Sequence, residues 1–159
     1  MVVRTLKICC LVLLLSMLAL PVQACFGPKL FLGVPADSDG QVLTSLVAIY
    51  IKEKTGIDTE RVDLADRTVR QEISADKLDY GFVAENDSLQ TILNVKGLPL
   101  LVSGPRILND LQFTTVAPAL QRLQKILKPE HVEQIRQDVD NGTLPMAAAR
   151  KFLMKQRWI

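Results

Sequence analysis

Residues 29–57, KLFLGVPADSDGQVLTSLVAIYIKEKTGI, constrain the fold more than any other stretch of this sequence. An almost uninterrupted apolar run over residues 29–34 predicts a strand that is buried on both faces. Apolar residues at helical spacing follow from Val42, and they predict a helix that ends at Gly56. A strand, a polar turn and a helix in this order open an α/β domain. In such domains ligands bind beyond the carboxyl ends of the strands.

The next segments repeat this pattern of strands and helices. Alternating polar and apolar residues over 59–64 predict a second strand, and the apolar run over 78–84 predicts a third. Between them, Asp66 is expected to cap a helix over residues 67–75. Strands that alternate with helices in this way imply a parallel sheet with right-handed crossovers.

The second half of the chain is predicted to be mainly helical. The polar residues 85–88 are expected to start a helix that runs to about Asn94, and residues 98–102 are predicted to form a fourth strand. Later apolar stripes predict helices that begin near Thr114 or Thr115, at Pro129 and at Thr143. The expected fold is therefore α/β: a three-layer sandwich with a mostly parallel sheet of about four strands, followed by C-terminal helices.

The amino-terminal residues indicate export. Arg4 and Lys7 precede an apolar run over residues 8–20, and small residues that resemble a cleavage site follow it. The apolar run is shorter than the roughly 20 residues that a membrane span needs. We therefore predict that residues 1–24 are a signal peptide and that residues 25–159 form one domain.

Cys25 directly follows the predicted cleavage site. The sequence VQAC over residues 22–25 resembles a bacterial lipoprotein box, in which the cysteine carries the lipid and becomes the mature N-terminus. The alternative is ordinary cleavage after Ala24, which would leave an unpaired thiol in an oxidising compartment. We favour lipidation of Cys25, and we expect a periplasmic or cell-envelope protein of a bacterium, anchored to the membrane as a lipoprotein.

Charge and composition exclude several classes of function. The chain has a formal charge of +2, and the part that follows the predicted signal peptide is neutral, so no nucleic-acid partner is expected. His131 is the only histidine, and a solvated surface position is expected for it, so neither a metal site nor a Cys/His catalytic site is predicted. No phosphate loop follows the first strand, and no cofactor is expected. An exported enzyme that uses Asp37, Asp39 or Glu85 as acid or base is the least favoured hypothesis.

Three stretches, taken in order, carry a family resemblance. They are the opening unit over residues 29–57 with the following TERVDL, the segment ISADKLDYGFVAE over residues 73–85, and the tail over residues 111–156. Together they resemble the substrate-binding proteins of ABC importers. The likeness is to the glycine betaine/proline/choline type, which has the type II periplasmic-binding fold. The resemblance implies the fold and a link to ABC import.

The chain departs from this family in two ways. Members of the family have two α/β lobes that clamp the ligand, whereas this chain is long enough for one, so the resemblance implies a truncated, single-lobe member. The family also holds quaternary ammonium groups with Trp and Tyr faces. In this chain Trp158, Tyr50 and Tyr80 lie outside the predicted strand-end turns, so betaine binding is not carried over.

The candidate site lies where the predicted parallel strands end. The turns at residues 35–41, 65–67 and 85–88 are expected to project from the same edge of the sheet, together with the N-terminus of the first helix. The candidate ligand-binding residues there are Asp37, Ser38, Asp39, Gln41, Asp66, Arg67, Glu85 and Asn86.

These residues lead to two functional hypotheses. The first is an exported, non-catalytic, solute-binding-like protein linked to an ABC-type transmembrane transport system for glycine betaine or a similar osmolyte. Its partners would be a small polar solute and an ABC permease or another envelope protein. The alternative is a degenerate lobe that acts as a protein-interaction module in the cell envelope. A polar, concave strand-end face would favour the first hypothesis, and an exposed apolar face would favour the second.

Overall fold

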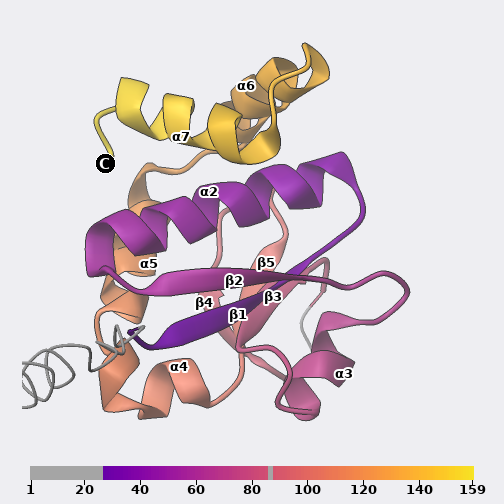
Figure 1. Cartoon of the computed structure of the whole chain (residues 1–159), viewed down its shortest axis with the longest axis vertical. Coiled ribbons are helices and arrows are strands. Elements are labelled where there is room, and N and C mark those ends of the chain that lie inside the picture. The colour runs from indigo at the N-terminus through magenta and orange to yellow at the C-terminus, as the bar shows by residue number, and fades with distance from the viewer. Residues whose placement is uncertain (1–26, 86–87) are drawn as a thin grey trace, which may run out of the picture.

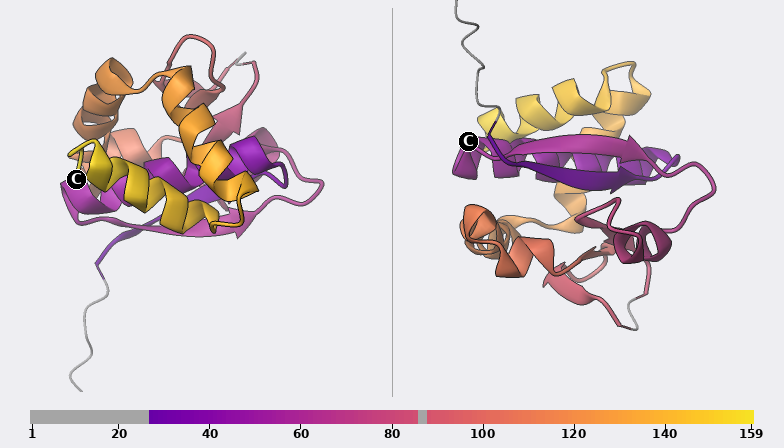
Figure 2. Two further views of the ribbon diagram at one scale, coloured as in Figure 1. Left: turned by 90° about the horizontal axis from the view of Figure 1, so that it is seen from above. Right: turned by 60° about the horizontal axis from the view of Figure 1, so that its bottom comes forward.

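The structure is a computed structural model that describes residues 27–85 and 88–159. The predicted signal peptide and the predicted lipidation site at Cys25 lie outside these residues. Strand β1 (Lys29–Val34) and helix α2 (Ser38–Thr55) occupy the centre of the fold, and both were predicted from the sequence (Figure 1). The helices that follow cover both faces of the sheet and the far side of α2 (Figures 1 and 2).

The remaining elements follow in chain order. They are β2 (Asp58–Asp63), α3 (Val69–Ser74), β3 (Tyr80–Val83), β4 (Gln90–Leu93), β5 (Leu100–Ser103), α4 (Arg106–Asn109), the 3-10 helix η1 (Leu111–Phe113), α5 (Val116–Ile126), α6 (Pro129–Asp140) and α7 (Pro145–Lys155).

The described residues form a five-stranded sheet with the strand order β2-β1-β3-β5-β4. Strand β1 is parallel to both of its neighbours, β2 and β3. Strand β5 is antiparallel to β3 and to β4, so β4 runs in the same direction as β1, β2 and β3. The α/β class is confirmed. The expectation of a mostly parallel sheet of about four strands was wrong, because two of the four strand pairings are antiparallel and a fifth strand is present.

The additional strand is β4, which lies where the sequence predicted a helix ending near Asn94. Its apolar residues Ile92 and Leu93 are buried. The strand pairs with β5, and residues 94–99 form the loop that connects the two strands. A short apolar run of this kind does not by itself distinguish a strand from a helix. Antiparallel pairing with β5 decides the outcome here, and Thr91 and Ile92 are β-branched residues that suit a strand.

Helix α3 begins later than predicted. Its N-cap is Thr68 rather than Asp66, and the Thr68 hydroxyl accepts a hydrogen bond from the backbone N–H of Gln71 at 3.3 Å. The side chain of Gln71 accepts a hydrogen bond from the backbone N–H of Thr68 in return, at 3.3 Å. This reciprocal capping box satisfies two backbone donors at the start of the helix, which explains why Thr68 replaces Asp66 as the cap.

Helix α2 is buried on both sides. Every residue from Val42 to Ile51 is buried, because the sheet covers one side of the helix while α6 and α7 cover the other (Figure 2). The two polar residues in this run are satisfied within the helix: the Thr44 hydroxyl donates to the carbonyl of Gly40 at 2.8 Å, and Ser45 donates to that of Gln41 at 2.7 Å. The sequence indicated only one apolar face for this helix.

The C-terminal helices begin close to their predicted positions. Pro129 and Pro145 each lie in the first turn of a helix, where a missing N–H leaves no hydrogen bond unmade. Helix α7 packs against α2 through small residues, among which Ala148 and Ala149 are both 0% exposed. Leu144 rather than Thr143 occupies the N-cap position of α7. Among the described residues, no helix combines the length and apolar character that a membrane span needs.

Candidate functional site

The structure contains the sheet edge at which the sequence placed the candidate site. Strands β1, β2 and β3 run parallel, so the turns that follow Val34, Asp63 and Val83 leave the same edge of the sheet. Because β4 runs in the same direction, the loop 94–99 that follows it lies at this edge too. The sequence did not place this loop there, since it predicted a helix in place of β4.

The first turn is organised by its own hydrogen bonds. The carboxylate of Asp37 accepts a hydrogen bond from the backbone N–H of Gly40 at 2.7 Å and caps α2. The side-chain amide of Gln41 donates to the carbonyl of Ala36 at 3.2 Å. Ser38 and Asp39 are exposed. Asp37 and Gln41 therefore shape the turn, whereas Ser38 and Asp39 present side chains to solvent.

The second turn is held by Arg67. Its guanidinium donates to the carboxylate of Glu72 at 2.7 Å and to the carbonyl of Leu64 at 3.1 Å, and it also contacts the carbonyl of Asp63. The side chain of Glu72 is 7% exposed, so Arg67 provides the charge that a buried carboxylate requires. The neighbouring Asp66 is exposed. Arg67 thus has a structural role, and Asp66 faces solvent.

The third turn contributes one described candidate, Glu85, which is exposed. Asn86 lies outside the described residues. The chain then returns to the opposite edge of the sheet. Gln90, at the start of β4, pairs with Ser103, which in turn pairs with Tyr80 at the start of β3.

A groove of about 200 Å³ lies beside the start of α2. Asp39 lines it from α2, residues 97–99 line it from the β4–β5 loop, and Arg136 lines it from α6. Gly97 adopts a φ of +86°, and a Cβ atom there would lie 3.1 Å from Cγ of Pro129. The loop therefore approaches the start of α6 closely, and this approach closes one side of the groove.

Carboxylates surround the single guanidinium in this groove. Arg136 donates to Glu133 at 2.7 Å and to Asp140 at 2.8 Å, and its Nε lies 3.8 Å from a carboxylate oxygen of Asp39. The hydrogen bond from Arg136 lowers the pKa of Glu133, and the same contact raises the pKa of Arg136. Of these charged groups Asp39, Glu133 and Arg136 line the groove, so two carboxylates face one cation there, and all of them are exposed enough to be screened by salt.

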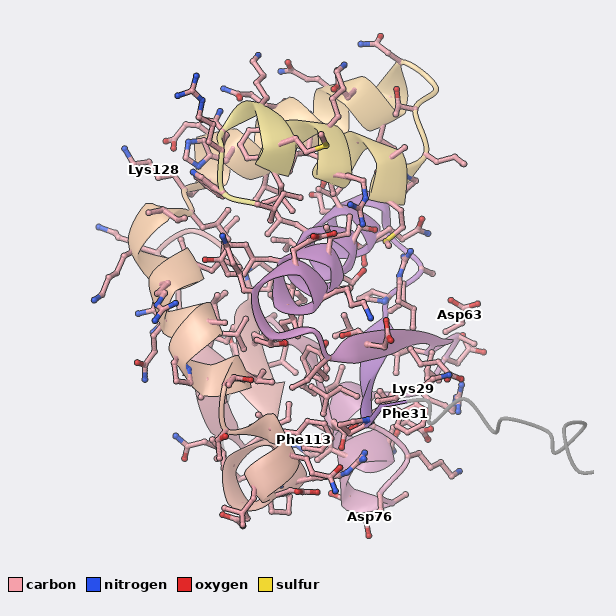
Figure 3. All side chains as sticks on the ribbon, turned by 60° about the vertical axis from the view of Figure 1, so that its left-hand side comes forward. Lys29, Phe31, Asp63, Asp76, Phe113 and Lys128 are labelled. Carbon is pink, nitrogen blue, oxygen red and sulfur yellow. The ribbon has the colours of Figure 1, made fainter. Side chains whose placement is uncertain are left out.

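A second polar cluster lies at the opposite edge of the sheet and was not identified from the sequence. Asp79, which is 5% exposed, accepts a hydrogen bond from the backbone N–H of Phe31 at 2.7 Å and lies 3.0 Å from Nη1 of Arg106. The guanidinium of Arg106 stacks 4.8 Å from the ring centroid of Phe113. Phe31, Asp76 and Phe113 gather around this corner (Figure 3). The sequence signal that could have indicated this cluster is Asp79, an acidic residue immediately before the buried strand β3.

The described residues contain no group of three His, Cys, Asp or Glu side chains that could hold a metal ion. His131 is half-buried rather than solvated. Its ring centroid lies 5.4 Å from that of Phe152 and 5.2 Å from that of Trp158, and its Nδ1 accepts a hydrogen bond from the backbone N–H of Lys128 at 3.3 Å. His131 thus connects the start of α6 to the end of α7 through these ring contacts.

The groove next to Asp39 and Arg136 is a concave surface at the strand-end edge. It combines one predicted residue, Asp39, with residues of α6 and of the β4–β5 loop that are distant in the sequence. No protein-family model and no curated protein matches this chain.

Proposed function

We propose that the protein is a non-catalytic, solute-binding-like lobe linked to an ABC-type transmembrane transport system for glycine betaine or a similar osmolyte. Export and membrane anchoring through a lipid on Cys25 belong to the same proposal. The resemblance of three ordered stretches to substrate-binding proteins supports it. The observation that carries it is the groove between Asp39, the loop 97–99 and Arg136, at the edge where the parallel strands end.

The charges in the groove suggest the class of solute. The carboxylates of Asp39 and Glu133 line the groove beside the single guanidinium of Arg136, so a small polar solute with a positively charged group would be favoured. Of the predicted ligand-binding residues, Asp39 is the one that lines this groove. A groove on one lobe leaves much of the solute in water, whereas ordinary sites bury about 70–90% of their ligand. We therefore expect weak binding to the monomer.

The small size of the groove favours a second candidate function. Its volume of about 200 Å³ is below the roughly 300 Å³ at which ordinary ligand sites begin. The edge around it presents the exposed polar side chains of Ser38, Asp66 and Glu85. By the polarity of this edge the first function is favoured, and it is the small size of the groove that would suit a degenerate lobe acting as a protein-interaction module in the cell envelope, with a permease or another envelope protein as its partner.

A thermal-shift and calorimetry series on the full chain tests the first function. Glycine betaine, choline, proline and an uncharged sugar are compared, because a solute that binds the folded state raises the melting temperature. We expect weak stabilisation by the solutes that carry a positive group. Asp39→Asn should reduce it, whereas Asp58→Asn, which alters an exposed carboxylate at the opposite edge of the sheet, should leave it unchanged.

Two results would count against this proposal. Tight one-to-one binding to a confirmed monomer would contradict the expected weak affinity of a single open lobe. If no solute shifts the melting temperature while the protein forms a stable complex with a purified permease, the interaction module becomes the better account.

A further inference from the structure

A cavity of about 200 Å³ lies at the amino-terminal edge of the sheet, opposite to the edge where the parallel strands end. Three segments line it: the first half of β1, the residues around the α3–β3 connection, and the corner that joins β5 to α4. Figure 3 shows this corner, around which Phe31, Asp76 and Phe113 lie. We call it the Asp79 cavity. It shares no lining residue with the groove at Asp39, so it is a separate candidate site.

The Asp79 cavity contains a carboxylate that can accept one more hydrogen bond. Asp79 is 5% exposed, and its Oδ2 accepts the backbone N–H of Phe31 at 2.7 Å and Nη1 of Arg106 at 3.0 Å. Among the described residues, its Oδ1 accepts only Nη1 of Arg106, at 3.1 Å. A carboxylate oxygen has about two acceptor positions, so one position on this nearly buried group is unused. The cavity therefore suits a ligand that carries a hydrogen-bond donor.

Arg106 provides the complementary group. Its Nη1 makes both contacts to Asp79, and its Nε and Nη2 make no hydrogen bond with any described residue. The guanidinium carbon lies 4.8 Å from the ring centroid of the buried Phe113, and this stacking holds the plane of the guanidinium. Two N–H groups along one side of a guanidinium match the two oxygens of a carboxylate. The side chain is 43% exposed, so a ligand carboxylate can reach it.

Asp76 adds a second negative charge to the lining. It is exposed, and its carboxylate makes no hydrogen bond or ion pair with any described residue. Asp76 and Asp79 together place two carboxylates against the one guanidinium of Arg106. A simple anion would be repelled by the excess negative charge, and a metal cation would meet the guanidinium beside the buried carboxylate. A ligand that carries both an ammonium group and a carboxylate matches all three charged side chains.

The rest of the lining is largely apolar. Ile73 and Leu78 are each 4% exposed, and Phe31 and Pro105 complete the apolar part of the wall. The volume of about 200 Å³ is below the roughly 300 Å³ at which ordinary ligand sites begin, so the ligand must be small. A short aliphatic side chain would cover the apolar wall and remove it from water.

We propose that the Asp79 cavity binds a small aliphatic α-amino acid. The ligand carboxylate pairs with Nε and Nη2 of Arg106, and the ligand ammonium group donates to Oδ1 of Asp79 and is attracted by Asp76. The aliphatic side chain lies against the apolar wall. Glycine betaine has no N–H and cannot make the hydrogen bond to Asp79, which distinguishes this cavity from the groove at Asp39. The inference goes beyond the proposed function and does not rest on it.

A nuclear magnetic resonance titration of the full chain tests the proposal with L-valine and two analogues. Isobutylamine is L-valine without its carboxylate, and isovalerate is L-valine without its ammonium group. We expect L-valine to bind with a dissociation constant of about 1 mM and to shift the backbone amide signals of Phe31 and Gly104, which both bond to Asp79. Each analogue loses one charged hydrogen-bonded contact, so it should bind at least about tenfold more weakly. Glycine betaine should bind as weakly as the analogues.

Two variants with a matched control assign the contacts. Arg106→Lys keeps a cation beside Asp79 but has no planar pair of donors, so it should weaken L-valine binding about tenfold while the melting temperature is retained. Asp76→Asn removes an exposed charge at a φ of +54°, which Asn tolerates, and it should weaken binding by about two- to fivefold. Asp63→Asn makes the same change in charge on an exposed residue at the opposite edge of the sheet, and it should leave the affinity unchanged.

Three results would overturn the proposal. They are the absence of any shift at Phe31 and Gly104 on addition of L-valine, equal affinity for L-valine and both analogues, and unchanged affinity in Arg106→Lys. Shifts confined to residues 97–99 and Arg136 would place the amino acid in the groove at Asp39 and would overturn the proposal as well, while they would support the proposed function.

Discussion

The carboxylate of Asp79 lies 3.0 Å from Nη1 of Arg106 and joins the amino-terminal edge of the sheet to α4. Asp79 is 5% exposed, and it also accepts the backbone N–H of Phe31 at 2.7 Å. One buried carboxylate thus connects β1, the start of β3 and the corner after β5. A cavity of about 200 Å³ lies beside it, and Phe31, Asp79 and Arg106 are among the residues that line it.

Replacing Asp79 should destabilise the fold to a degree that depends on the replacement. Asp79→Ala leaves the partly buried N–H of Phe31 without its carboxylate acceptor, and we expect a loss of about 1–3 kcal/mol in the free energy of unfolding. Asp79→Asn keeps an oxygen acceptor for that N–H, so it should cost less. Urea unfolding of both variants checks this, and equal losses would show that the hydrogen bond to Phe31 contributes little.

Gly81 and Val69 should behave as a coupled pair. A Cβ atom at position 81 would lie 2.8 Å from both γ-methyl groups of Val69, so Gly81→Ala forces α3 away from β3. We expect Gly81→Ala to cost about 1–3 kcal/mol. Val69→Ala removes the obstructing methyl groups, and the double variant should lose less stability than the sum of the two single variants. Additive losses in urea unfolding would contradict the close contact.

The packing of α7 on α2 should be intolerant of larger side chains. Ala148 is 0% exposed, so Ala148→Leu should separate the two helices and destabilise the protein by about 1–3 kcal/mol. Ala147 is the neighbouring residue on the exposed side, and Ala147→Leu should change stability by no more than about 0.5 kcal/mol. Thermal unfolding of the two variants makes the comparison, and similar melting temperatures would argue against the packing described for α7.

Stability should fall below neutral pH because of His131. Burial lowers the pKa of His131, the charge of Lys128 lowers it further, and Glu130 opposes the shift. The unfolded chain therefore binds a proton more readily than the folded protein. The stabilisation is fully present above the unfolded pKa of about 6.5, and it is lost as pH falls through the lower folded pKa. The free energy of unfolding, measured across this pH range, should depend less on pH in His131→Gln than in the wild type. The same pH dependence in both proteins would show that His131 is not the group responsible.

Much of the fold followed from short-range signals. In residues 29–57 the apolar run and the terminal Gly56 defined the bounds of β1 and the end of α2, whereas α2 begins at Ser38, earlier than the helical spacing from Val42 indicated. The strand directions could not be predicted for the second half. An apolar run such as residues 98–102 carries no information on direction, and the antiparallel pairing of β5 with β3 depends on contacts between distant segments.

The candidate site was predictable only in part. The parallel pairing of β1, β2 and β3 correctly placed three polar turns at one edge. Polar residues in those turns were treated alike, yet Asp37 and Arg67 bond to their own turns, and Asp39 faces a groove. The partners of Asp39 come from α6 and from the β4–β5 loop, and the spacing of residues within the sequence gives no means to identify them.

The position of α2 between the sheet and the final two helices has a consequence for biosynthesis. This helix leaves the ribosome before α7, which shields its outer flank. A nascent chain halted before Pro145 has no α7 to cover that flank, and proteins with such uncovered surface are bound by chaperones or degraded. The fold of this lobe is therefore complete only after α7 has been synthesised, so deletion of residues 145–155 should reduce the cellular yield far more than their distance from the groove suggests.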